Sequence, residues 1–121
     1  VKNQTYRMTM LFDFYGDILT ERQRELFDLY YNEDLSLAEI AENCGISRQG
    51  VRDVIVRAEA AMNELEDKTG LLKRFMRMQD SVDAIVAAAN EIKTINYRQY
   101  ENHRLEELAD SIIAGAGVLK E

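Results

Sequence analysis

The sequence predicts an all-α protein, and three observations support that prediction. Proline is absent from the 121 residues, and strong helix formers such as Glu, Leu and Ala are abundant. Apolar residues recur at spacings of three and four along the chain, whereas few stretches alternate between apolar and polar residues. Ser and Thr residues also precede several of the periodic segments, at the position where a helix is capped.

The first two predicted helices cover residues 6–19 and about 21–31. Residues 6–19 place a set of apolar side chains on one face. These side chains are Met10, Leu11, Phe14, Tyr15 and Ile18. Thr20 is positioned to cap the second helix, and Gln23, three residues later, completes a capping box. Residues 32–35 then interrupt the helical pattern.

The stretch SLAEIAENCGISRQGVRD has the pattern of a helix-turn-helix, which needs a short helix, a tight turn and a second helix. Ser36 and Glu39 are spaced as a capping box for the short helix. Gly45 can adopt the positive φ that ends this helix. Ser47 is positioned to cap the second helix.

The second helix of this motif is expected to run to about Lys68, with Gly70 as its terminator. Its apolar residues keep a regular three-four spacing. They are Val51, Val54, Ile55, Ala58, Met62 and Leu65. The small Ala41 permits a close crossing of the two helices, and Ile46 can insert from the turn into the core. Several independent constraints therefore agree on the motif.

Two more long helices are predicted after Gly70, over residues 71–94 and 97–113, with a frayed end beyond them. The apolar residues of the first follow close to a heptad rhythm. We therefore expect two parts, a helix-turn-helix domain over residues 1–70 and a C-terminal helical segment over residues 71–121. The second part is too small for an independent core, so it must pack on the first part, on another copy, or on both. We predict a homodimer.

The outward positions of the second motif helix are the candidate DNA contacts. Arg48 and Arg52 can each take guanine by two hydrogen bonds, and Gln49 can take adenine in the same way. Ser47 and the free backbone N–H groups of the helix start can hold a phosphate. Arg57 lies further along and either contacts the DNA backbone or simply solvates that face.

The charge balance is an objection to DNA binding. The chain has 22 acidic and 15 basic residues, and its formal net charge is −7. Phosphate neutralisation dominates affinity for DNA, so an excess of acid weakens binding. Five of the twelve acidic residues over residues 20–69 lie at the far ends of their helices, and only Asp53 lies among the proposed contacts. The five are Glu33, Asp34, Glu64, Glu66 and Asp67. Some helix-turn-helix units bind proteins instead, and that alternative stays open.

The blocks LTERQRELFDLYY, SLAEIAE and ISRQGVRD, together with RMTMLFDFYGDILT before them, resemble the YlxM family. These are small bacterial proteins similar to region four of sigma factors. The resemblance covers about residues 6–75. It implies a sigma region four-like helix-turn-helix bundle, here followed by the long C-terminal helices. It also implies that Arg48, Gln49 and Arg52 are DNA contacts.

The same resemblance implies a cellular role. YlxM genes lie beside the gene for the GTPase of the signal recognition particle, so family members are connected with that protein-targeting pathway. The leading interpretation is a DNA-binding regulatory protein that acts in or regulates this pathway. The competing interpretation is a non-enzymatic adaptor that binds the targeting GTPase or RNA polymerase through the helix-turn-helix surface.

No residue pattern points to an enzyme, and we expect no catalytic site, no cofactor and no metal site. Cys44 is the only cysteine, and its context indicates a half-buried turn residue rather than a nucleophile. His103 is the only histidine, and Glu106 and Glu107 beside it are ordinary helix neighbours.

The hydropathy pattern shows no run of eighteen or more apolar residues, so we expect no membrane insertion. The first ten residues, VKNQTYRMTM, lack the apolar core of a signal peptide. The expectation is a cytoplasmic protein whose partners are DNA, a second copy of itself, and a component of the targeting or transcription machinery.

Overall fold

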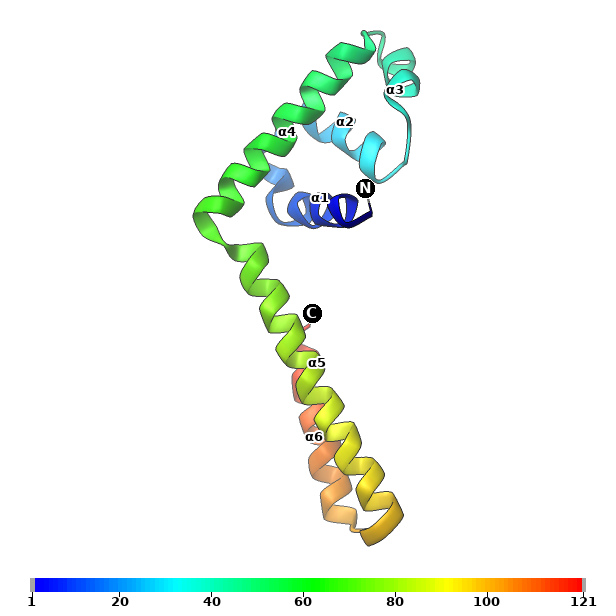
Figure 1. The fold of residues 1–121 in the computed structure, drawn as a ribbon, viewed down its shortest axis with the longest axis vertical. Coiled ribbons are helices and arrows are strands. Elements are labelled where there is room, and N and C mark those ends of the chain that lie inside the picture. Colours follow the sequence, from blue (N-terminus) through cyan, green and yellow to red (C-terminus); the bar gives the residue numbers. More distant parts are fainter. Residues whose placement is uncertain (1, 121) are drawn as a thin grey trace. The chain divides into compact units, whose positions relative to one another are not determined.

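The computed structural model describes residues 2–120, with side chains from residue 5 onward, and this part of the chain is helical with no strand (Figure 1). The all-α prediction is therefore confirmed. The elements in order are α1 (Lys2–Tyr15), the 3₁₀ turn η1 (Gly16–Ile18), α2 (Glu21–Tyr31), α3 (Leu37–Cys44), α4 (Arg48–Thr69), α5 (Leu71–Ile95), the π-helical turn η2 (Asn96–Tyr100) and α6 (His103–Val118).

The chain divides into two compact units, Val1–Leu72 and Lys73–Glu121. We call them the N-terminal unit and the C-terminal unit. The N-terminal unit contains α1 to α4 and the first turn of α5, and the C-terminal unit contains the rest of α5, η2 and α6. None of the helices in the described part of the chain is both long and apolar enough to span a bilayer.

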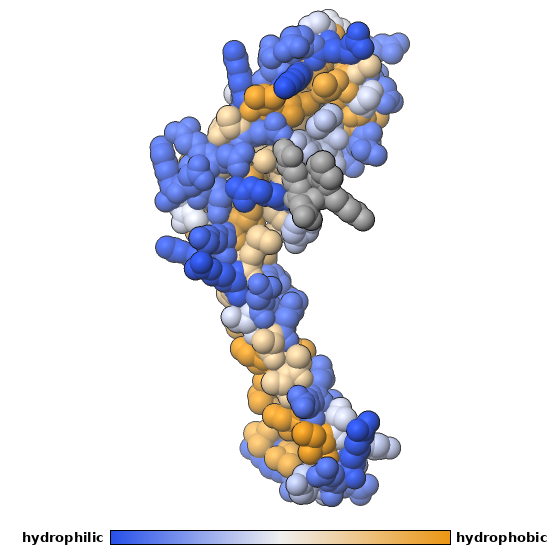
Figure 2. Space-filling model, viewed as in Figure 1, coloured by the Kyte–Doolittle hydropathy of each residue, from blue (hydrophilic) through white to orange (hydrophobic). Residues whose placement is uncertain are grey.

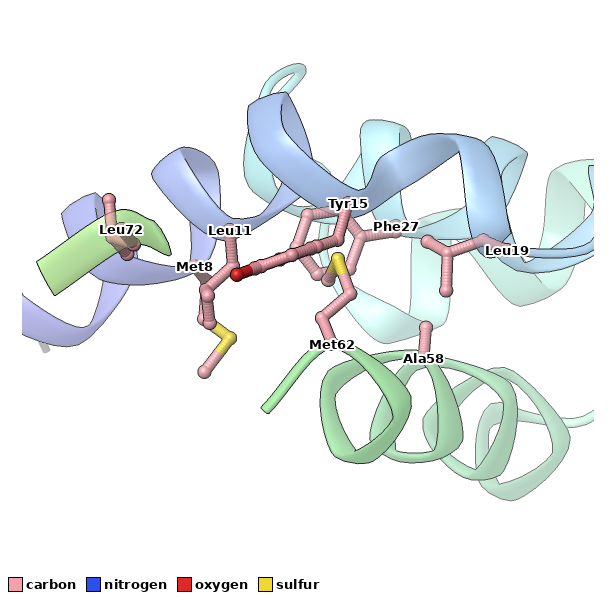
Figure 3. Close-up of a cluster of buried hydrophobic side chains, with 8 residues drawn as sticks. All are labelled: Met8, Leu11, Tyr15, Leu19, Phe27, Ala58, Met62 and Leu72. Atoms are coloured by element: carbon pink, nitrogen blue, oxygen red, sulfur yellow. The ribbon is translucent and has the colours of Figure 1, made fainter. Parts of the chain in front are cut away.

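One hydrophobic cluster of the N-terminal unit joins α1, α2, α4 and the start of α5 (Figure 3). Phe27 of α2 is fully buried at its centre and stacks on Phe12 of α1 at a ring distance of 4.8 Å. Met62 and Ala58 enter this cluster from α4, and both are fully buried. The cluster therefore holds the middle and the end of α4 against the two helices that come first in the chain.

A second cluster joins α2, α3 and α4 at the other end of α4. Its buried residues are Leu26, Ile40, Ala41, Val51 and Ile55. Burial of a Val, Leu or Ile side chain, as at four of these positions, stabilises a fold by about 1.5–3 kcal/mol. The two clusters together fix α4 along most of its length.

Helix α1 differs from its prediction at both ends and in its phase. It begins at Lys2, before the predicted start, and gives way after Tyr15 to η1. The large apolar residues of this segment that are buried are Met8, Leu11, Tyr15 and Leu19. The prediction that Phe14 and Ile18 share the buried face is wrong, because they are 36% and 53% exposed. Met8, Leu11, Tyr15 and Leu19 follow one another at spacings of three and four residues and so form one apolar stripe, beside which Phe14 and Ile18 lie.

The C-terminal unit is a helical hairpin in which α6 returns along α5 (Figure 1). The predicted range of α5 is confirmed to within one residue at its end, but the predicted range 97–113 is wrong for α6. Asn96 explains the late start of α6 at His103. Its side chain donates a hydrogen bond of 2.7 Å to the carbonyl of Asn102 and accepts one of 2.8 Å from the Asn102 N–H. The turn between the helices is therefore closed by side-chain bonds.

The end of α6 also differs from the expectation of a frayed terminus. Helix α6 continues to Val118, and Ala116 is buried within the C-terminal unit. Two residues after the end of α6, Lys120 forms an ion pair of 2.6 Å with Asp83 of α5, which ties the end of the described chain to α5. Alanine has a high helix propensity, and these contacts compensate for the two glycines of the AGAG sequence.

Candidate nucleic-acid interface

The helix-turn-helix consists of α3, a tight turn and α4, as the sequence predicts. Ser36 Oγ accepts a hydrogen bond from the Glu39 N–H, and the Glu39 side chain accepts one from the Ser36 N–H. The same reciprocal pair joins Thr20 and Gln23 at the start of α2. Both predicted capping boxes are confirmed. They begin the two helices that support α4.

The turn of the motif depends on Gly45. This residue has φ of 68° and ends α3 with its N–H bonded to the carbonyl of Ala41. The Ile46 N–H is also bonded to the Ala41 carbonyl, at 3.2 Å, and the Ile46 side chain packs on the second cluster. A positive φ is a conformation that glycine adopts without steric cost. The turn therefore sets the direction in which α4 begins.

The start of α4 presents free donors. Ser47 Oγ accepts a hydrogen bond of 2.9 Å from the Gly50 N–H, and the Ser47 carbonyl accepts one from the Val51 N–H. The N–H groups of Arg48 and Gln49 lie in the first turn, where an α-helix has no carbonyl to offer them. The partial positive charge of a helix N-terminus lies at the same place. This end of α4 can hold a phosphate, with the Ser47 hydroxyl as a further donor.

Arg48 and Arg52 are exposed and lie one turn apart on the same side of α4. Within the described part of the chain, neither forms an ion pair. Two guanidinium groups are thus available to an outside partner, although the chain as a whole is acidic. An arginine that forms no ion pair with a carboxylate of its own chain can pair with a phosphate or with the edge of a guanine base.

Gln49 and Asp53 form the next line of exposed residues on α4. Gln49 Nε2 donates a hydrogen bond of 2.9 Å to Asp53 Oδ1. This bond holds the carboxamide in one orientation, but the amide oxygen and the second N–H of Gln49 remain for a ligand. Asp53 is the acidic residue among the contacts, and its engagement by Gln49 orients it along the helix.

Arg57 is not brought together with the other two arginines. It is exposed and makes no ion pair with any residue that the structure describes. A rotation of about 100° per residue places Arg57 about 140° around the α4 axis from Arg52. Arg57 therefore points toward a different part of the surroundings than Arg48 and Arg52.

A hollow of about 310 Å³ lies beside Arg52, and sequence reasoning did not identify it. Its wall includes Tyr30 and Tyr31 of α2 and Val56 and Glu59 of α4. Val56 is 46% exposed although it is apolar. Val56 and Glu59 follow Arg52 by four and seven residues, so helical spacing alone places them near Arg52.

Tyr31 connects this hollow to the core. Its hydroxyl donates a hydrogen bond to the carboxyl group of Glu59. Burial raises the pKa of the Tyr31 phenol above its ordinary value, and the hydrogen bond to Glu59 and the charge of Glu59 raise it further. The pair joins α2 to α4 in the wall of the hollow that Arg52 also lines.

The two residues considered for other chemistry, Cys44 and His103, belong to different units of the chain. Cys44 is half-buried at the end of α3 and packs on the second cluster. His103 is at the start of α6, where its Nε2 is 2.9 Å from a Glu107 carboxyl oxygen. In the described residues no three His, Cys, Asp or Glu side chains gather as a metal site would require.

A sequence profile of the family described as "Putative helix-turn-helix protein, YlxM / p13 like", or UPF0122, matches residues 2–110. The chain belongs to the UPF0122 family. Membership confirms the resemblance drawn from residues 6–75. The UPF0122 match also continues through α5 and into α6, where the sequence alone showed no resemblance.

Several UPF0122 proteins are similar to this chain. One from Thermoanaerobacter sp. strain X514 is 50% identical over 78 residues, which cover 64% of this chain and 67% of that protein. One from Bacillus thuringiensis strain Al Hakam is 41% identical over 109 residues, or 90% of this chain and 94% of the relative. One from Acetivibrio thermocellus is 36% identical over 116 residues, or 90% and 99%. Similarity to the family therefore extends over residues of both units of the chain.

Proposed function

We propose that the protein is a DNA-binding regulatory protein of the YlxM type. In this proposal the N-terminal end of α4 enters the major groove, as the second helix of a helix-turn-helix does. The observation that carries the proposal is the pair Arg48 and Arg52. Both are exposed and unpaired within the described residues, and both stand on a helix whose position two buried clusters hold.

Each candidate residue has a role in this proposal. Arg48 and Arg52 contact guanine edges or the phosphates beside them, and the free face of the Gln49 carboxamide contacts adenine. Ser47 and the first N–H groups of α4 hold a phosphate. Arg57, which faces away from these residues, contacts the phosphate backbone at the margin of the interface.

The acidic charge of the chain limits the affinity of a single copy. Few phosphates are neutralised by so small a set of basic groups, and each contact contributes to a steep dependence on salt. A homodimer that presents two copies of α4 raises the effective affinity, because the second contact becomes intramolecular. We therefore propose that the DNA-binding form is a homodimer that reads two half-sites.

The family resemblance suggests the cellular setting. We propose that the protein acts in or regulates the signal recognition particle pathway of protein targeting. Similarity to sigma region four adds contact with RNA polymerase as a further part of this proposal. Neither part assigns an enzymatic activity to the chain.

A second candidate function is an adaptor that binds a protein partner, the targeting GTPase or RNA polymerase, through the same surface. The observation that favours it is the hollow beside Arg52, in which exposed Val56 lies near Tyr30 and Leu37. A recess that combines exposed apolar side chains with an arginine and a carboxylate suits a protein side chain better than it suits a DNA backbone.

One experiment separates the two candidates. The full chain is used to select bound fragments from a random pool of duplex DNA at low salt, beside the double variant Arg48→Ala/Arg52→Ala. The DNA-binding proposal expects a common sequence to be enriched by the wild type and not by the variant. Enrichment of no sequence above the pool, or the same enrichment by both proteins, would contradict it and favour the adaptor.

A further inference from the structure

The C-terminal hairpin has a narrow contact line between its two helices. Val82 and Ala89 of α5 and Ala109 and Ala116 of α6 are its buried apolar residues, each at most 6% exposed. Three of these four side chains are alanines, so the hairpin buries little apolar surface by itself. A pair of helices of this size rarely supplies a sufficient core, and such units usually need a second layer.

Large apolar side chains remain exposed beside this contact line. On α5 they include Met78, Ile85 and Ile92, and on α6 they include Leu105, Leu108 and Ile112. Their exposed fractions lie between 38% and 46%. Figure 2 shows apolar residues, in orange, over α5 and α6. Side chains of this kind are only half removed from water by the hairpin.

These six residues lie on one face of the hairpin. With about 100° of rotation per residue, these six residues lie about 30–90° from the buried line of their helix, in the same rotational sense in both helices. The exposed Met76, Ile95 and Val118 lie outside this sector, near the ends of the two helices. Because α5 and α6 run in opposite directions, the same sense in each helix leads to the same side of the pair. We call this side, with Met78, Ile85, Ile92, Leu105, Leu108 and Ile112, the apolar face.

The other side of the hairpin is polar. Lys93 Nζ lies 2.7 Å from Asp110 Oδ1, and Lys120 Nζ lies 2.6 Å from Asp83 Oδ1. The same helical rotation places both aspartates on the side opposite the apolar face. The hairpin is therefore one-sided, with ion pairs between its helices on one face and unpaired apolar residues on the other.

We infer that the apolar face is the surface through which two copies of the chain associate, so that their hairpins form a four-helix bundle. The inference deepens the proposed homodimer by naming its surface, and it rests on that part of the proposed function but not on DNA contact. In a two-fold dimer the same patch meets itself, so a face without like charges is required. Among the described residues of α5 and α6, no acidic side chain lies within this face, although the chain has a net charge of −7.

The size of the face agrees with a second copy as its occupant. The 16 residues of α6 extend about 24 Å, and two neighbouring helices are together about 20 Å wide. Two copies bring about 1,000 Å² of such faces into contact, which is where specific interfaces begin. The longer α5 and the uneven surface add to this area.

The test measures the mass of the full-length chain in solution by sedimentation velocity over a range of concentrations. The wild type is expected to have twice the 14.0 kDa of one chain. The double variant Ile85→Glu/Ile112→Glu places charge in the apolar face and should be monomeric. The matched control Ala87→Glu/Ala114→Glu adds the same charge to exposed positions on the polar side of the same helices, and it should remain dimeric.

A second pair of measurements covers variants that fail to fold. The variant Ile85→Ala/Ile112→Ala keeps good helix formers and should weaken association at least 10-fold, with helix content by circular dichroism retained at high concentration. The melting temperature of the wild type should rise with its concentration. A wild type that is monomeric at every concentration, or a dimer that is disrupted only by the control variant, overturns the inference. A monomer that still binds DNA would overturn the dimer alone and leave DNA binding in place.

Discussion

The hydroxyl of Tyr15 donates a hydrogen bond of 2.7 Å to the buried carboxyl group of Glu66, which lies 51 residues later in the chain. The same carboxyl oxygen accepts a hydrogen bond of 2.9 Å from the N–H of Leu72 in the first turn of α5. Glu66 is only 7% exposed. One side chain thus joins the end of α1, the last turns of α4 and the start of α5.

Replacement of this acid should destabilise the N-terminal unit. Glu66→Ala leaves the Leu72 N–H and one bond of the Tyr15 hydroxyl without their acceptor, and we expect a loss of about 1–3 kcal/mol in the free energy of unfolding. Urea denaturation followed by circular dichroism measures it. Glu64→Ala is the matched control, because its exposed ion pair with Lys68 should contribute less than about 0.5 kcal/mol. Equal losses in the two variants would refute the role given to Glu66.

Stability should fall at alkaline pH because of two tyrosines. Burial raises the pKa of Tyr15 and of Tyr31 above the ordinary value, and hydrogen bonds to Glu66 and Glu59 act in the same direction. The unfolded chain therefore releases these protons first, so stability is fully present below about pH 10 and is lost as the pH rises from there toward the folded pKa values.

The variant Tyr31→Phe tests this pH dependence. It removes one of the two buried phenol groups that lose a proton on unfolding at this pH. Between pH 9 and 11 the free energy of unfolding should therefore fall less steeply than in the wild type, and the slopes should differ by up to about 1.4 kcal/mol per pH unit. Urea denaturation at a series of pH values gives the slope. Tyr97→Phe removes a hydroxyl from a residue that is 81% exposed and serves as the comparison. If both variants show the wild-type slope, burial of Tyr31 has no such effect.

The turn of the helix-turn-helix should be sensitive to replacement of Gly45. Nothing crowds a Cβ at this position, so the cost of Gly45→Ala comes from its φ of 68° and should be about 1–2 kcal/mol. Gly45→Asn should cost less, because asparagine tolerates this conformation. Gly115→Ala lies within α6 in open space and should instead stabilise its helix by up to about 1 kcal/mol. Thermal or urea unfolding of the three variants gives the order, and a harmless Gly45→Ala would contradict it.

The helix-turn-helix was predictable from the sequence because its determinants are local. Thr20, Ser36 and Ser47 each cap the helix that follows them, with an acceptor bond to a residue three positions later. Gly45 ends α3 by its own backbone conformation. Such signals span a few residues, and they agree with the spacing of the buried side chains in the same segment. The exposure of Arg48 and Arg52 follows from that spacing.

Other features depend on residues that are distant in the chain. Glu66 reads as a surface residue, since acids are rarely buried, and its burial is explained only by Tyr15 and the start of α5. The sequence predicts too early a start for α6 because the bonds between Asn96 and Asn102 have no sequence signature. The sequence predicts the wrong phase for α1 because Leu11 and Tyr15 fit two apolar stripes, one with Phe14 and Ile18 and one with Met8 and Leu19, and only the contacts in the fold select the second.

Binding of DNA by Arg48 and Arg52, as proposed, is tested most directly by the affinity of the full chain for its selected duplex over a range of salt concentrations. The wild type should show a steep fall in affinity as salt rises. Arg48→Ala and Arg52→Ala should each weaken binding about 10-fold or more, and an arginine that contacts phosphate should also lower the salt slope by about 1. Arg98→Ala, which removes the same charge from exposed η2, should change little. Absence of binding at low salt, or equal effects of all three variants, would contradict the claim.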